Sequence, residues 1–148
     1  MKPLTASLVD TDVFSLVYVK KSSADTRVPG WKLHLTSRRV LISFQTRAEV
    51  LSGARSAGWG NTRMTQLMDI LDRMPTIYSD DDVVDAYATL GADCRRIGHA
   101  LHGREHSGDR WIAACAIAKG LQLVAGDAIY NGAPNLDLFN STSNGDVV

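Results

Sequence analysis

Short apolar runs that end in polar or turn residues alternate along the chain with longer stretches of helical periodicity. Leu8 and Val9 form the first short run, and Val13, Leu16 and Val17 then follow at helical spacing. A second pair of elements recurs near the other end, where a buried helical pattern stops at a glycine and a short apolar strand follows. This alternation predicts an α/β fold whose central strands run parallel.

The remaining elements follow from the same patterns. Further strands are predicted at residues 38–44, 76–78 and 121–124, with an edge strand at 136–139. Helices are predicted at residues 47–51, 64–74 and 83–97, and from Asp109 to the stop at Gly120, with Thr46 as the N-cap of the first of them. Surface loops are predicted at residues 20–30 and 100–106, and a frayed, disordered tail at residues 140–148.

Length and composition bound the class of protein. The chain has 148 residues of which 45% are apolar, which predicts one domain over residues 1–148 with a single ordinary core. Lys plus Arg and Asp plus Glu number 16 each, so the net charge is zero and any basic surface must be local. Cys94 and Cys115 lie in apolar helical patterns and are expected to be reduced core thiols. No long apolar run is present, so we expect a cytoplasmic protein without a signal peptide or membrane span.

Acidic residues follow two of the predicted strands. Asp10 comes directly after the first strand and Asp127 lies just beyond residues 121–124. Ligands of open parallel sheets bind outside the carboxyl ends of the strands, so both carboxylates are expected where chemistry occurs. Asp109 at a helix start and Glu49 on a helical face with small neighbours could join them. Each of these two also has a structural interpretation, Asp109 as a first-turn charge and Glu49 as half of a capping box.

Four carboxylates brought together would repel one another and partly protonate, so their coexistence implies a compensating cation. Oxygen ligands of this kind suit Mg²⁺ or Mn²⁺. Such an ion stabilises charge on phosphoryl oxygens and lowers the pKa of a bound water, which suits phosphodiester hydrolysis. The chain carries no nucleophile-elbow, Walker A, dinucleotide-binding or Cys-x-x-Cys motif that would point to another chemistry.

Four segments, in this order and spacing, resemble the PIN-domain ribonucleases, and most closely the toxins of bacterial VapBC-type toxin–antitoxin pairs. They are LVDTDV at 8–13, SxxTxAE at 43–49, SGDRWIAAxA at 107–116 and GLxLVxGD at 120–127. The resemblance covers about residues 6 to 139. It implies a three-layer α/β/α sandwich with a central, mainly parallel sheet. It also implies metal-dependent cleavage of single-stranded or structured RNA, often transfer or ribosomal RNA, a cognate antitoxin and a homodimer.

The resemblance also assigns residues. The acidic positions of the family, which hold Mg²⁺ or Mn²⁺ and carry catalysis, fall on Asp10, Glu49, Asp109 and Asp127, with Thr11, Asp12 and Thr46 as supporting residues. Two features depart from the family. Ala125 and Gly126 stand where many relatives have polar residues, and the loop over residues 20–31 is longer than expected and could alter substrate access.

Contacts to RNA and to an antitoxin can be assigned only as candidates. Arg110, Arg47 and Arg104 are the cations expected to contact RNA phosphates, with Arg110 foremost because it adjoins Asp109. The helix bearing Met64, Leu67, Met68 and Leu71 is expected to serve as core and as a docking groove for the antitoxin. A zinc site at His102 and His106 is not expected, because no Cys or third His accompanies them. For the segment with His99, His102 and His106, substrate contacts and an ordinary exposed loop both stay open.

Two alternatives stay open. Asp10-Thr11-Asp12-Val13 also fits the opening motif of haloacid-dehalogenase-like phosphatases, in which Asp10 would be the nucleophile. That interpretation leaves Glu49 without a role and places Lys119 too close to Asp127 to act as the phosphate-binding lysine. The second alternative is a non-catalytic PIN domain that binds RNA or a protein.

Overall fold

The computed structural model describes residues 5–139, which form a five-stranded sheet of order β3-β2-β1-β4-β5. The strands are β1 (Ala6–Val9), β2 (Arg39–Ser43), β3 (Thr76–Ile77), β4 (Gln122–Val124) and β5 (Leu138–Phe139). All neighbouring strands are parallel, and Leu8 in the centre is in register with Leu41 on one side and Leu123 on the other. The parallel sheet and its predicted strands are therefore confirmed. The predicted tail at residues 140–148 lies outside the described residues.

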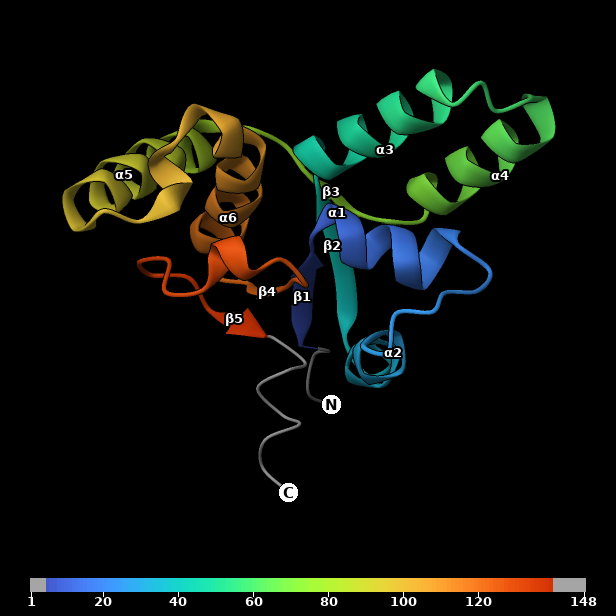
Figure 1. Ribbon diagram of the computed structural model, residues 1–148, viewed down its shortest axis with the longest axis horizontal. Coiled ribbons are helices and arrows are strands. Elements are labelled where there is room, and N and C mark those ends of the chain that lie inside the picture. The colour runs from blue at the N-terminus through green and yellow to red at the C-terminus, as the bar shows by residue number, and fades with distance from the viewer. Residues whose placement is uncertain (1–4, 140–148) are drawn as a thin grey trace.

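Helices cover both faces of this sheet (Figure 1). They are α1 (Thr11–Phe14), a π-helical turn η1 (Ser15–Val19), α2 (Val28–Leu35), α3 (Phe44–Ser56), α4 (Asn61–Asp72), α5 (Asp81–Ile97) and α6 (Ser107–Lys119), with 3₁₀ turns η2 (Ala100–His102), η3 (Arg104–His106) and η4 (Ala128–Tyr130). In Figure 1, α5 and α6 lie to one side of the sheet and α1 to α4 to the other. The fold is the predicted three-layer α/β/α sandwich.

Two apolar cores, one on each face of the sheet, hold these layers together. Successive strand residues point to opposite faces, so Leu8 joins the core under α5 and α6 while Val9 joins the core under α1 to α4. Leu123 and Val124 divide in the same way, and all four side chains are fully buried. Strands buried on both faces consist of continuous apolar residues, which is why the runs were visible in the sequence.

Two helix starts differ from the prediction. Helix α3 begins at Phe44, because the Ser43 hydroxyl, and not Thr46, caps it by accepting a hydrogen bond from the Thr46 N–H at 3.1 Å. Glu49 therefore takes no part in a capping box. The predicted loop over residues 20–30 is wrong at its end, since Val28 to Gly30 form the first turn of α2, where proline is well tolerated.

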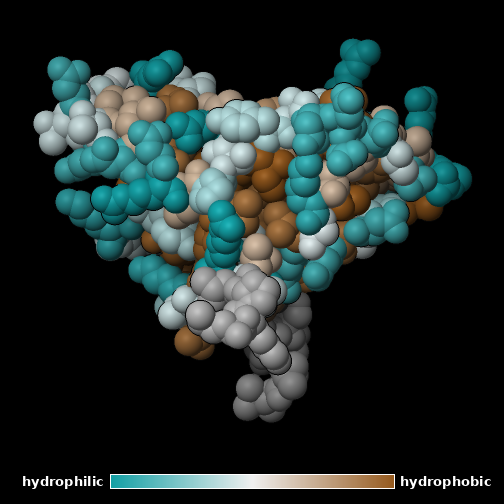
Figure 2. All heavy atoms as spheres, turned by 180° about the vertical axis from the view of Figure 1, so that it is seen from behind, coloured by the Kyte–Doolittle hydropathy of each residue, from teal (hydrophilic) through white to brown (hydrophobic). Residues whose placement is uncertain are grey.

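Other local predictions are confirmed. The helix predicted at residues 83–97 is α5, which Asp80 caps at its start and which ends at Ile97, before Gly98 in the left-handed conformation at φ 75°. Cys94 and Cys115 are buried free thiols. None of the helices in the described part of the chain combines the length and apolar character that crossing a bilayer demands. Seen from behind, polar side chains cover much of the surface and apolar ones show between them (Figure 2).

Candidate active site

A cavity of about 190 Å³ lies at the carboxyl ends of β1 and β4. The chain leaves β1 toward β2 and β3 and later places β4 on the other side of β1, so the strand order reverses here. The cavity is lined by Asp10, Thr11, Asp12, Glu49, Asp109, Ile112, Asp127 and Tyr130. The structure thus brings the four predicted acidic residues together, with Asp12 as a fifth carboxylate.

Asp10 is the buried member of this group, with 3% of its surface exposed. Its Oδ1 accepts a hydrogen bond from the Val13 N–H at 2.8 Å and caps α1. Asp10, and not Thr11 or Asp12, is therefore the N-cap of this helix. Burial raises the pKa of Asp10 to about 7, and the negative charges of Asp12 and Asp127 add to the effect, against the backbone N–H groups of Val13 and Gly126.

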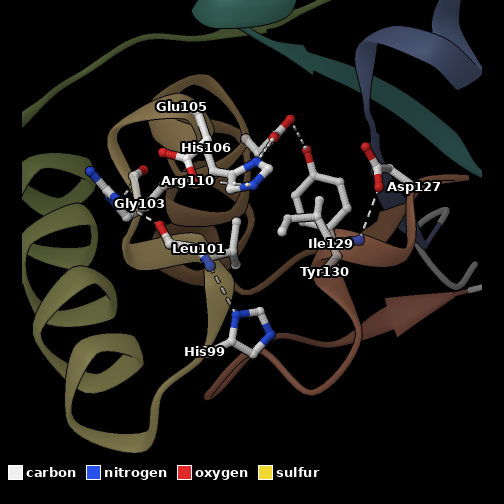
Figure 3. A network of polar contacts seen from close by, with 10 residues as sticks. His99, Leu101, Gly103, Glu105, His106, Arg110, Asp127, Ile129 and Tyr130 are labelled. Atoms are coloured by element: carbon white, nitrogen blue, oxygen red, sulfur yellow. Dashed lines mark hydrogen bonds and ion pairs between the residues drawn. The ribbon is translucent and has the colours of Figure 1, made fainter.

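Asp127 also caps a helical turn. Its Oδ1 accepts a hydrogen bond from the Ile129 N–H at 3.0 Å at the start of η4, as Figure 3 shows. The sequence interpretation had considered caps for Glu49 and Asp109, whereas the structure finds them at Asp10 and Asp127. The two roles are compatible, because the two oxygens of a carboxylate together accept about four hydrogen bonds or metal contacts, so capping leaves capacity for a ligand.

Glu49 is oriented by a chain of hydroxyl groups. Thr11 Oγ1 donates to Glu49 Oε2 and lies 3.0 Å from Thr46 Oγ1. An ionised carboxylate can only accept, so Thr46 must donate to Thr11. Ser43 Oγ donates in turn to Thr46 Oγ1 at 3.3 Å. Ser43 and Thr46 are fully buried, so their hydroxyl groups hold Thr11, and through it Glu49, from inside the fold.

Asp109, in the first turn of α6, is contacted on both oxygens. His106 Nδ1 lies 3.2 Å from Oδ2, and the Tyr130 hydroxyl donates to Oδ1 at 3.4 Å (Figure 3). Tyr130 is 1% exposed, and burial together with the surrounding carboxylates raises the pKa of its hydroxyl, so it stays a neutral donor. The sequence interpretation missed Tyr130. Its place three residues after Asp127, in a turn that follows a strand, was the available signal.

The donor set fits a hard divalent cation in its chemistry, because every ionisable side chain that lines the cavity other than Tyr130 is a carboxylate. The raised pKa of Asp10 points the same way, since a nearby cation would favour its charged form. Within residues 5–139, however, no three His, Cys, Asp or Glu side chains converge closely enough to form a finished metal site.

A comparison with protein families assigns the chain. The PIN domain model matches residues 7–134, which include every residue that lines the acidic cavity. The chain belongs to the PIN domain family. No curated protein matches it by sequence. The family match favours a nuclease over the phosphatase alternative.

Solved structures support the same fold for this PIN domain. VapBC2 from Rickettsia felis, bound to a fragment of its promoter DNA, matches with a TM-score of 0.72 and 21% identity over 92% of this chain and 98% of that one. FitAcB from Neisseria gonorrhoeae matches with a TM-score of 0.71 and 22% identity over 91% and 97%. VapBC-5 from Mycobacterium tuberculosis, a member of a family of toxin–antitoxin systems, matches with a TM-score of 0.62 and 24% identity over 92% and 98%.

The arginines predicted to contact RNA are placed differently from one another. Arg110 points its guanidinium group inward, where it donates to the Leu101 and Gly103 carbonyls and to the Tyr87 hydroxyl. Arg47 donates to the Leu71 carbonyl at 3.2 Å and pairs with Asp72 at 3.1 Å, so it ties α3 to the end of α4. Of the three, only Arg104 is exposed. The structure gives Arg110 and Arg47 packing roles.

A second, larger groove of about 1,120 Å³ adjoins the acidic cavity, and Thr11 and Glu49 line both. Leu67, Ile70 and Trp59 contribute apolar surface to it. Its basic residues are Lys20, Lys21, Arg63 and Arg73, and its other carboxylate is Asp69. Of the four residues predicted to form the docking groove, only Leu67 lines this groove. Leu71 is fully buried in the core, and Met64 and Met68 pack against that core.

Proposed function

We propose that this PIN domain is a metal-dependent endoribonuclease, and that it is the toxin of a toxin–antitoxin pair. The observation that carries the proposal is the single small cavity into which separate segments bring five carboxylates, at the carboxyl ends of β1 and β4. A nuclease that needs no side-chain nucleophile requires only such a set of hard donors and an open approach for RNA. Single-stranded or structured RNA, including transfer or ribosomal RNA, is the expected substrate.

Asp10, Glu49, Asp109 and Asp127 would hold Mg²⁺ or Mn²⁺. The bound ion would stabilise charge on the phosphoryl oxygens and make hydroxide available from water near neutral pH. The protein's own contribution is to orient the donors. Backbone N–H groups hold Asp10 and Asp127, and the hydroxyl chain behind Thr11 holds Glu49. His106 and Tyr130 hold Asp109 between them.

An antitoxin partner is supported by the groove beside the acidic cavity. A protein segment that filled this groove would also cover Thr11 and Glu49, because both line the two spaces, and it would thereby block the site. The solved structures of similar fold include toxin–antitoxin complexes. Lys20, Lys21, Arg63 and Arg73 of the same groove, together with Arg104, are the cations we expect to contact RNA phosphates when no antitoxin is bound. Homodimerisation is part of the same proposal.

The test uses purified protein, freed of any antitoxin, incubated with Mn²⁺ and single-stranded RNA. We expect cleavage by the wild type, and no cleavage by Asp10→Asn or Asp127→Asn although both variants fold. Asp85→Asn is a matched control, because Asp85 is exposed on α5 outside the cavity and should keep wild-type activity. Absence of cleavage by the wild type would favour a non-catalytic PIN domain, and trapping of an acyl-phosphate on Asp10 would favour a phosphatase.

A further inference from the structure

Arg27, in the turn before α2, reaches a residue next to the acidic site. Its Nη1 donates a hydrogen bond to the Gly126 carbonyl at 2.7 Å, across 99 residues of sequence. We propose that Arg27 is a positioning residue for the acidic site, which holds Gly126 and thereby sets the places of Asp10 and Asp127. The inference rests on the proposed nuclease function and assigns to Arg27 and Gly126 a role that the acidic motifs do not contain.

The guanidinium group of Arg27 is fixed before it reaches Gly126. Asp25 accepts from Nε at 3.1 Å and from Nη2 at 2.8 Å, and its Oδ1 also accepts from the Arg27 N–H at 2.9 Å. These bonds lower the pKa of Asp25 to about 2, so the pair stays charged at neutral pH. The guanidinium carbon lies 4.8 Å from the centre of the fully buried Trp31 ring. A group held this firmly is suited to fixing a backbone atom.

The absence of a side chain at Gly126 leaves room for Arg27 and Trp31. A Cβ at this position would lie 3.0 Å from Arg27 Nη1 and 3.0 Å from the Trp31 ring. Contacts at 3.0 Å are tighter than nine in ten real Cβ contacts, so a larger residue would push the guanidinium group or the ring aside by a few tenths of an ångström. This contact explains a departure noted in the sequence, where Gly126 stands in place of a polar residue. The long segment before α2, which carries Arg27, and the glycine after β4 therefore depend on each other, because they meet in this contact.

Gly126 links Arg27 to two carboxylates. Its N–H group faces the Asp10 carboxyl, its carbonyl accepts from Arg27, and the next residue is Asp127. A shift of the Gly126 backbone would therefore move a donor away from Asp10 and displace Asp127 in the cavity. Displacement of this kind weakens metal binding and catalysis more than it weakens folding. If Arg27 only anchored its own loop, its loss would lower the stability of the fold more than it lowers metal affinity and catalysis.

The test compares Arg27→Gln with wild type and with Arg96→Gln, a matched control in which the arginine belongs to a surface ion pair with Asp93 on α5. Mn²⁺ affinity is measured by titration calorimetry, and kcat and KM for RNA at saturating Mn²⁺. For Arg27→Gln we expect Mn²⁺ affinity and kcat to fall by about 10- to 100-fold, with KM little changed. Arg96→Gln should match the wild type in all three quantities.

Two further variants keep the proposal open to refutation if Arg27→Gln folds poorly. Arg27→Lys keeps the charge and a donor for the Gly126 carbonyl, and should recover most of the lost kcat. Gly126→Ala should lower kcat, and the double variant should lose less than the product of the two single losses, because both changes disturb one contact. Wild-type values of kcat and Mn²⁺ affinity in Arg27→Gln, or independent effects in the double variant, would overturn the proposal. A wild type that neither binds Mn²⁺ nor cuts RNA would instead overturn the proposed function, and this inference with it.

Discussion

The Thr11 hydroxyl donates a hydrogen bond to Glu49 and so joins the residue after Asp10 to α3 across the acidic cavity. Because the carboxylate can only accept, the remaining lone pairs of Thr11 face Thr46, whose own hydroxyl is bonded to Ser43. The direction of every hydrogen bond in this chain is therefore determined. Its buried members carry no charge and need no solvent, which suits a role in fixing an exposed carboxylate.

Thr11→Val should lower nuclease activity with little effect on folding. Valine keeps the shape of threonine but removes the donor, so Glu49 is free to rotate away from the cavity. Loss of one orienting hydrogen bond to a metal-site carboxylate lowers activity by about 10- to 100-fold, and we expect kcat to fall in this range. The measurement is steady-state RNA cleavage at saturating Mn²⁺. Thr65→Val, on the exposed face of α4, is the control, and an unchanged kcat in Thr11→Val would show that Glu49 needs no orientation.

Asp10→Asn should raise the melting temperature at pH 8 in the presence of a chelator. The pKa of Asp10 is about 7 in the folded protein against 3.8 ordinarily, so between these values the folded state keeps a proton that the unfolded chain releases. Stability therefore falls as the pH rises from about 4 to about 7, by about 1.4 kcal/mol for each unit of pKa difference. Asparagine keeps an oxygen to cap α1 and carries no charge, so it avoids this loss.

The gain from Asp10→Asn should almost vanish at pH 3, where the wild-type carboxyl is mostly protonated in both states. Adding Mn²⁺ at pH 8 should reverse the order, because the ion stabilises the wild type by binding and has lost a ligand in the variant. Thermal unfolding of both proteins at the two pH values, with and without Mn²⁺, tests this. Equal melting temperatures of the wild type and Asp10→Asn at pH 8 without metal would show that burying the charged Asp10 carboxylate does not destabilise the fold.

The sheet could be predicted because its strands are buried on both faces. Leu8 and Val9 contribute to different cores, so both must be apolar and the run stands out in the sequence. The carboxyl ends of such runs also locate Asp10 and Asp127. Their capping roles were missed because a cap depends on how the chain turns after the strand, and the apolar pattern carries no information on that turn.

The contacts that orient the carboxylates could not be predicted in the same way. Arg27 meets Gly126 across 99 residues, and no local pattern joins these positions. The prediction that Arg110 contacts RNA relied on a neighbour in sequence, and that neighbour was misleading. This neighbour, Asp109, lies in the cavity, but successive residues of a helix point in directions about 100° apart, so Arg110 faces Tyr87 instead. Adjacency along a helix therefore does not place two side chains in one site.

Cys94 and Cys115 should resist thiol reagents in the native protein. Both are fully buried, and burial raises the pKa of each thiol, for Cys115 to about 12. Only the thiolate reacts, so at pH 8 neither side chain offers an accessible nucleophile. Titration with a chromogenic disulfide should detect no fast thiol in the native protein and both thiols after denaturation. A fast-reacting thiol under native conditions would show that the packing around α5 or α6 opens readily.

Arg110→Met should destabilise the fold and leave RNA binding unchanged. The change removes the donors for the Leu101 and Gly103 carbonyls and for Tyr87, and partners left unpaired inside a protein cost about 1–3 kcal/mol. Arg104→Met is the matched comparison, because Arg104 is exposed and should contact phosphate. It should keep the stability of the wild type and reduce the slope of log Kd against log salt concentration by about one.

Both arginine variants are made in the Asp127→Asn background, so that RNA is bound without being cut. Urea unfolding gives the stability, and RNA affinity is measured at several salt concentrations. A smaller salt slope in Arg110→Met with unchanged stability would restore Arg110 as a phosphate contact. We expect Arg110→Met to lose stability and Arg104→Met to lose salt dependence of RNA binding. A general weakening of the fold would not produce both results. The two variants together therefore distinguish an arginine that stabilises the segment between α5 and α6 from one that contacts the substrate.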